Sequence, residues 1–97
     1  MNISKASEIT VQDVADYIRL DDPDEGELGE LTTFLSAAQA FVKAYTGQTD
    51  LDAHDDFVLA VLILCQDMYD NRTMYVDTQN LNFAVKSILD LHSVNLL

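Results

Sequence analysis

The side chains in this chain that could do chemistry are mostly carboxylates. Seventeen Asp and Glu residues stand against five Lys and Arg, giving a net charge of −12, with two histidines and one cysteine. A carboxylate indicates catalysis or metal binding only when a base, a nucleophile or a second ligand stands at a matched spacing. The acids are therefore informative only through their neighbours.

Two acidic stretches, residues 21–30 and 50–56, have the residue types of a calcium site but not its spacing. An EF-hand loop starting at Asp22 would have Gly26 at its fifth position and no Glu at its twelfth. A loop starting at Asp50 lacks both the central Gly and the final Glu. These acids are better explained as solvated N-caps of the helices that follow, so no metal site is expected.

The histidines, the cysteine and the serines form no catalytic set. His54 and His92 are far apart in sequence, and His92 has no matched partner. Cys65 falls in an apolar run and is expected to be a buried, unreactive thiol. Since there is no glycine-rich phosphate loop either, the sequence predicts a protein that is not an enzyme and needs no cofactor.

The element that must position the other residues is a central helix, predicted over residues 57–72. It opens with nine consecutive apolar residues, Phe57 to Cys65, and continues with apolar residues only at Met68 and Tyr69, which is helical spacing. A helix that is apolar nearly all round at one end packs at the centre of a domain. A membrane span would need about 20 apolar residues.

Three further helices are expected to wrap the central one. They are predicted over residues 11–19, 25–46 and 80–92. A loop with a short extended piece at 74–76 separates the last helix from the central one. The sequence thus predicts an all-α fold, a small bundle of about four helices that forms a single domain over residues 1–97.

Helix-capping residues support these boundaries. Thr10 and Asp13 have the spacing of a capping box, with Asp in place of Glu. Either Asp22 or Asp24 is placed to cap the second helix, and Gly47 is placed to end it.

The net charge limits the partners. Binding to the outside of DNA or to an anionic membrane requires positive charge, so neither is expected. The acids serve either solubility alone or a surface that lies near nucleic acid without adhering to it. The N-terminal residues contain no apolar core of signal-peptide length, so synthesis in the cytoplasm is expected.

The final residues, SVNLL, are apolar at Val94, Leu96 and Leu97. Chain ends are usually polar and frayed. These three residues are therefore expected to dock, either onto their own domain or onto a partner.

Two longer segments have a familiar pattern: AAQAFVKAYTG at 37–47 and LCQDMYDNR at 64–72. Together with the short first helix and the acidic turn, they resemble the phage head–tail connector family, the small adaptor or head-completion proteins of long-tailed phages and prophages. Most of the match lies in Ala44 to Gly47 and in the ending Tyr69-x-Asn71-Arg72. The last helix is similar to the family's closing Ile/Leu-rich helix but lacks its basic residue near the end.

The resemblance implies a structural protein of the virion, present in the host cytoplasm during assembly. Such proteins form a homo-oligomeric ring of about twelve copies below the portal protein. The ring extends the DNA channel towards the downstream head–tail joining or tail proteins, and DNA passes through it without specific binding. The family's C-terminal region lies towards the portal, which implies a docking role there for Val94, Leu96 and Leu97.

Tyr69, Asn71 and Arg72 are then candidate inter-subunit contacts. A local explanation stands beside this one, because an Arg at a helix C-terminus favours the helix dipole and can bond the last carbonyls. The charge also supports an alternative function, an acidic inhibitor that mimics DNA in the basic groove of a nucleic-acid-binding protein.

Overall fold

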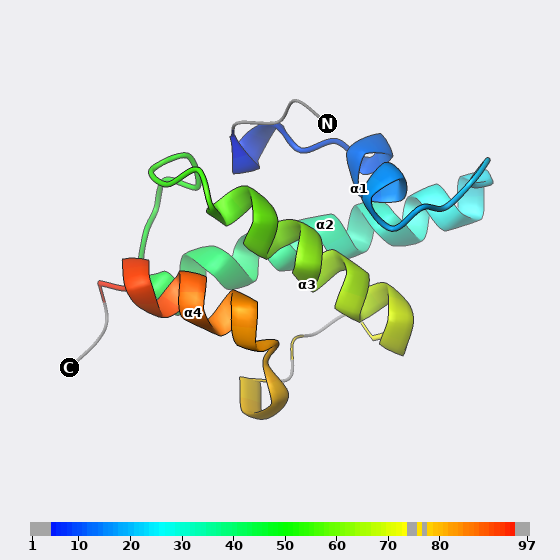
Figure 1. Cartoon of the computed structure of the whole chain (residues 1–97). Helices are drawn as coiled ribbons and strands as arrows, with labels where there is room; N and C mark the ends of the chain where they lie inside the picture. The colour runs from blue at the N-terminus through cyan, green and yellow to red at the C-terminus, as the bar shows by residue number, and fades with distance from the viewer. Residues whose placement is uncertain (1–4, 74–75, 77, 95–97) are drawn as a thin grey trace.

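Four α-helices and two short 3₁₀ turns make up the regular structure (Figure 1). The computed structural model describes residues 5–73, 76 and 78–94. The elements are η1 (Ala6–Glu8), α1 (Val11–Tyr17), α2 (Glu25–Thr46), α3 (Phe57–Asn71), η2 (Thr78–Asn80) and α4 (Phe83–His92). The prediction of an all-α bundle is confirmed, and no strand occurs in the described part of the chain.

Helix α3 is the centre of the bundle. The long helix α2 packs along it, α4 lies on one side of it, and α1 lies on the other side across α2 and α3 (Figure 1). Its fully or almost fully buried side chains are Phe57, Ala60, Val61, Leu62, Leu64, Cys65 and Met68. These residues join those of the other helices in one hydrophobic cluster, as expected for a helix that is apolar nearly all round.

The ends of α2 lie where its capping residues predict. Asp24, not Asp22, is the N-cap: Asp24 Oδ1 accepts from the Glu27 N–H at 2.8 Å, and Glu27 Oε1 accepts from the Asp24 N–H at 3.2 Å. This reciprocal pair satisfies two backbone donors that the helix itself leaves unpaired. At the other end Gly47 adopts φ 73°, the left-handed conformation that glycine reaches without a steric penalty.

Helix α1 is shorter than the predicted range of 11–19. The Thr10–Asp13 capping box is present, but the helix ends at Tyr17, and Arg19 takes φ 61°. The Leu20 N–H bonds to the Ala15 carbonyl at 2.9 Å, which closes a Schellman turn with arginine in the glycine position. The reversal turns Leu20 back against the core, where it is partly buried.

Helix α4 begins at Phe83, so the prediction of a helix from residue 80 was wrong at that end. Asn82 is the N-cap, and its Oδ1 accepts from the N–H groups of Ala84 and Val85. A side chain that bonds the first free N–H groups fixes where a helix starts. Of the predicted extended piece, residues 74 and 75 lie outside the described residues, and Val76 belongs to no regular element.

Replacing Leu64 by Ala tests whether α3 is the stabilising centre. Leu64 is 2% exposed, so its truncation should lower the free energy of unfolding by about 2–5 kcal/mol. Leu59→Ala is the matched control, because Leu59 lies on the same helix and is 45% exposed. Both variants are measured by urea unfolding. If they lowered the free energy of unfolding equally, the assignment of Leu64 to the buried side of α3 and of Leu59 to its solvated side would be contradicted.

Candidate protein-interaction surface

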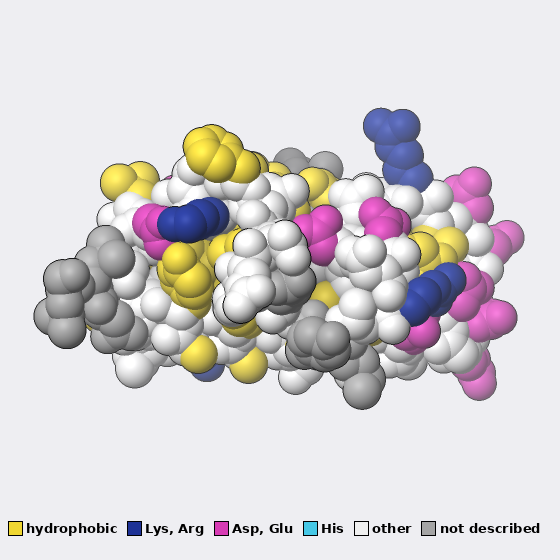
Figure 2. Space-filling model, turned by 90° about the horizontal axis from the view of Figure 1, so that it is seen from below, with side chains coloured by type: hydrophobic (Ala, Val, Ile, Leu, Met, Phe, Trp, Pro, Cys, Tyr) yellow, Lys and Arg dark blue, Asp and Glu magenta, His cyan; other side chains and the backbone are white. Residues whose placement is uncertain are grey.

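Acidic side chains gather at one end of the molecule. Figure 2 shows Asp and Glu concentrated at the end where α1 leads into α2, the stretch 21–30 of the sequence. Part of this charge has a structural role, because Asp24 and Glu27 cap α2. Asp21, Asp22 and Glu25 are exposed and make the surface of this end negative, whereas Glu30 pairs with Arg72.

Large apolar side chains are exposed on and just after α4. Phe83 is 82% exposed, Leu91 is 74% exposed and Val94 is 63% exposed, and together they are called the outer face of α4. In Figure 2, which looks onto the side of the molecule where α4 lies, apolar side chains stand out between polar ones. The apolar side of α4 that faces the core consists of Val85 and Leu89, which are buried, and Ile88, which is partly buried, whereas Ala84 is exposed.

Of the three tail residues predicted to dock, only Val94 lies within the described residues. The Val94 N–H donates to the Thr46 carbonyl at 2.7 Å, which ties the start of the tail to the end of α2. The Val94 side chain nevertheless remains exposed. Leu96 and Leu97 lie outside the described residues.

The Ala44–Gly47 segment joins α2 to α4. The Tyr45 hydroxyl donates to Asp90 Oδ1 at 2.6 Å, and Asp90 also pairs with Lys86 one turn earlier on α4. The hydrogen bonds from Lys86 and then Tyr45 lower the pKa of Asp90, and the bond to Asp90 raises the pKa of Tyr45. Thr46, which is fully buried, donates to the Val42 carbonyl and accepts from Val94.

The three candidate inter-subunit residues, Tyr69, Asn71 and Arg72, all make contacts within the subunit. The Arg72 guanidinium lies 4.4 Å from the centre of the Tyr69 ring and pairs with Glu30 on α2. Asn71 Nδ2 donates to the backbone carbonyl of Asp67 at 2.8 Å. Arg72 itself caps α3 in the left-handed conformation, φ 53°, through its backbone N–H rather than its guanidinium. A surface ion pair of this kind contributes little to stability.

The two histidines lie together, which the sequence did not predict. The rings of His54 and His92 stack with centroids 3.6 Å apart, and both meet the Phe57 ring edge-on. His92 Nε2 lies 2.9 Å from Asp56 Oδ2, so the interpretation that His92 has no matched partner was wrong. The bundle brings the end of α4 against the start of α3, a contact that only the tertiary structure decides (Figure 1).

The acids at 50–56 do not cap α3 with their side chains, contrary to the prediction. Asp56 occupies the N-cap position but makes no side-chain capping bond, because its carboxylate faces His92. Asp52 accepts from the hydroxyl and the N–H of Ser7 near the N-terminus, and these bonds lower the pKa of Asp52. The stretch thus anchors neighbouring segments.

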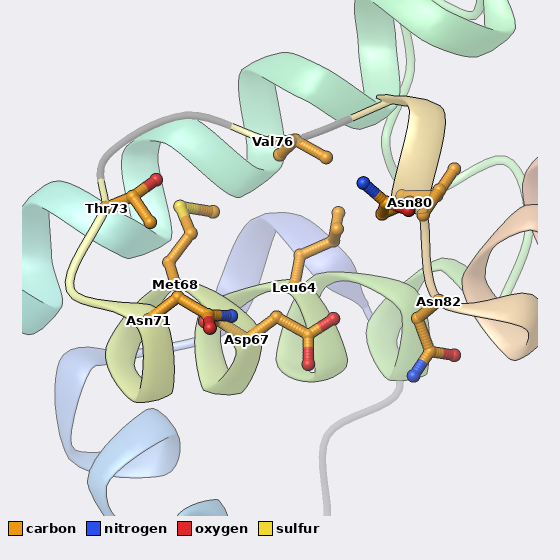
Figure 3. Close-up of a pocket in the computed structure, with 9 residues that line it drawn as sticks. Leu64, Asp67, Met68, Asn71, Thr73, Val76, Asn80 and Asn82 are labelled. Carbon is orange, nitrogen blue, oxygen red and sulfur yellow. The ribbon is translucent and has the colours of Figure 1, made fainter.

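A pocket of about 350 Å³ opens between the second half of α3 and the segment leading to α4 (Figure 3). Its floor comes from α3, while Thr73 and Val76 lie over it and the residues before α4 close one side. The lining residues are Leu64, Asp67, Met68, Asn71, Thr73, Val76, Asn80, Leu81 and Asn82. The pocket therefore combines apolar walls with a carboxylate and several side-chain amides.

Asp67 is the charged group of this pocket. Burial, followed by repulsion from Asp70, raises the pKa of the Asp67 carboxyl. None of the ion pairs among the described residues involves Asp67. This pocket was not predicted from the sequence, although Leu64, Asp67 and Asn71 share one face of α3 at helical spacing.

The single cysteine, Cys65, is buried in the core. Burial raises the pKa of the Cys65 thiol to about 12, so the reactive thiolate is disfavoured at neutral pH. Within residues 5–73, 76 and 78–94, no three His, Cys, Asp or Glu side chains are placed to hold a metal ion. No helix in that part of the chain is long and apolar enough to cross a membrane.

Comparison of the chain with protein-family models, curated proteins and solved structures finds no match.

Asp67→Asn should stabilise the free protein at neutral pH. Because the pKa of Asp67 is raised in the fold, its charged form opposes folding at high pH, and this cost disappears as pH falls and the carboxyl is protonated. Thermal unfolding should give a higher Tm for the variant at pH 7 and nearly equal Tm values near pH 3. Asp70→Asn, at an exposed position on the same helix, should give a smaller increase. A lower Tm for Asp67→Asn at pH 7 would contradict the burial cost.

Proposed function

We propose that this chain is the subunit of a phage or prophage head–tail connector, a ring below the portal protein that extends the DNA channel towards the tail. The observation that carries the proposal is the exposure of Phe83, Leu91 and Val94 on a molecule whose opposite end is acidic. The exposed apolar surface is suited to contact with another protein, and the acidic surface is suited to the solvated wall of a channel. The resemblance of residues 37–47 and 64–72 to connector proteins supports the same assignment.

The outer face of α4 suits a protein partner. Large side chains more than 60% exposed, as at these three positions, lose contact with water when a partner covers them. A chain of 97 residues has a limited core, and association stabilises such a subunit by mass action. We assign the outer face to the contact with the portal, in line with the resemblance.

The acidic end suits a wall that DNA must pass. Carboxylates repel phosphates, so a channel lined by residues 21–30 would let DNA move without adhering to the protein. This role requires no catalytic group and no bound metal.

The alternative is an acidic inhibitor that mimics DNA, and the net charge of −12 supports it equally well. Such an inhibitor would work as a free protein, and exposed apolar side chains on α4 would then be a liability for solubility. Affinity for a basic nucleic-acid-binding protein, together with no affinity for heads, would favour the inhibitor.

Retention on purified, DNA-filled heads tests the connector assignment. Leu91→Ser and Val94→Ser should reduce retention at least tenfold while leaving the Tm nearly unchanged, because both side chains are exposed and the Val94 N–H is kept. Leu59→Ser is the control, since Leu59 is an exposed leucine on α3. If wild-type protein is not retained at all, the connector assignment fails. If Leu91→Ser and Val94→Ser are both retained like wild type, the portal contact lies elsewhere, and the acidic turn at 21–30 is the next candidate.

Duplex DNA at low salt tests the channel-wall role. Attraction between a protein and DNA phosphates is strongest at low ionic strength, so an acidic wall should show no binding even there. The measurement is fluorescence anisotropy of a labelled duplex titrated with wild-type protein. At about 10 mM salt the Debye length is about 30 Å, so electrostatic attraction would be readily detected. Measurable affinity for the duplex under these conditions would contradict the channel-wall role.

A further inference from the structure

Two histidines and one aspartate join the end of α4 to the start of α3 (Figure 1). The imidazole of His92, in the last turn of α4, stacks on that of His54 with centroids 3.6 Å apart and planes inclined by 17°. His92 Nε2 lies 2.9 Å from Asp56 Oδ2, and both imidazoles stand nearly perpendicular to the buried Phe57 ring. His54, Asp56 and His92 are called the histidine cluster.

Two hydrogen bonds beside the cluster hold the same end of α4. The His92 carbonyl accepts from Gln48 Nε2 at 3.0 Å, and the Val94 N–H donates to the Thr46 carbonyl at 2.7 Å. Both bonds join the end of α4 to the segment that follows α2, and the stacked rings join the same two parts of the chain. Separation of the rings would therefore expose the Val94 N–H, which makes this amide a reporter of the cluster.

Asp56 is the charged group that faces the two imidazoles. The nearby acids outside the cluster have other partners or are exposed: Asp50 accepts from the Asp52 N–H, Asp52 accepts from Ser7, Asp55 is exposed, and Asp90 pairs with Lys86. On the side of α2, Thr46 and Gln48 carry no charge and Lys43 is exposed. The ion pairs among the described residues include His92 but not His54.

The cluster favours one proton and opposes a second. A first proton makes His92 an imidazolium facing the Asp56 carboxylate, whose Oδ1 is buried without a hydrogen-bond partner among the described residues. A second proton places a positive charge on His54, face to face with the first and without a paired carboxylate in the described part of the chain. The His92 side chain is 17% exposed, so water screens this repulsion only partly.

We propose that the histidine cluster is a pH switch: it holds the end of α4 while the two imidazoles carry at most one proton, and a second proton releases that end. Once the end is released, both imidazoles can take up protons as they do in water. The released form therefore binds more protons than the held form, and acid favours release. Imidazole ordinarily titrates near pH 6.5, so release is expected between about pH 7 and pH 5.

The switch goes beyond the connector assignment and does not depend on it. Leu91 and Val94 belong to the end that is released, and they form the C-terminal part of the outer face of α4. Protonation would therefore change how this part of the outer face is presented to a partner.

The carboxylates with shifted pKa values do not imitate this effect. Hydrogen bonds from Lys86 and then Tyr45 lower the pKa of Asp90, so the Tyr45–Asp90 bond persists at pH 5. Burial raises the pKa of Asp67, and protonation of that carboxyl favours the fold, which is the opposite sign. Acid-induced opening at the end of α4 therefore reports the imidazoles.

Hydrogen exchange of the Val94 amide in the whole chain tests the switch. Its protection factor, corrected for the intrinsic pH dependence of exchange, should fall at least about tenfold between pH 7 and pH 5, because one extra bound proton shifts the opening equilibrium by up to about tenfold per pH unit. The Gly47 amide, which donates to the Lys43 carbonyl at the end of α2, is the internal reference. Val94 protection that stays constant relative to Gly47 overturns the proposal.

His54→Phe keeps an aromatic ring in the stack but cannot take up a proton. Its Val94 protection should equal that of wild type at pH 7 and should not fall at pH 5. Asp55→Asn is the matched control, because it removes an exposed neighbouring charge and should keep the pH dependence of wild type. A fall in protection that persists in His54→Phe overturns the switch.

A second measurement decides if the phenylalanine packs badly, which lost Val94 protection at pH 7 would reveal. The imidazole Cε1–H signals of wild type, followed by NMR, should then move in two steps separated in pH, because the rings sense each other's charge. One common step overturns the proposal. Every measurement uses the free protein, so a negative result leaves the connector assignment to the test of retention on heads.

Discussion

The structure depends on the burial of α3. This helix is apolar over most of its surface, and seven of its fifteen residues are buried by α2, α4 and the N-terminal elements. Burying one large aliphatic side chain contributes about 1.5–3 kcal/mol, so α3 provides much of what holds a small domain together. The surrounding helices are amphipathic and need α3 as the surface on which their own apolar stripes are buried.

Polar contacts decide how α4 sits on this core. Tyr45 bonds Asp90, Thr46 accepts from Val94, and Gln48 Nε2 bonds the carbonyl of His92. These bonds all join the end of α2 to the end of α4, while Val85 and Leu89 bury one side of α4 in the core. Its opposite side is left to solvent, and this is why Phe83 and Leu91 are exposed.

Four of the described residues carry a free-energy cost in the fold. Arg19, Asp22 and Arg72 adopt a positive φ, and Asp67 lies in a pocket without a counter-charge among the described ion pairs. Glycine at the first three positions would adopt the positive φ freely, and an amide in place of the Asp67 carboxyl would remove the buried charge.

The sequence by itself determined the helices, because hydrophobic spacing and capping are local. It predicted α2 over residues 25–46 with Gly47 at its end, left its N-cap open between Asp22 and Asp24, and predicted α3 through its apolar run. Only the tertiary structure decided which polar residues meet. His54, Asp56 and His92 come together because α4 returns to the start of α3, and the Asp67 pocket exists because Thr73 and Val76 lie over α3. Contacts between residues far apart in sequence depend on how the helices pack, and no local pattern encodes them.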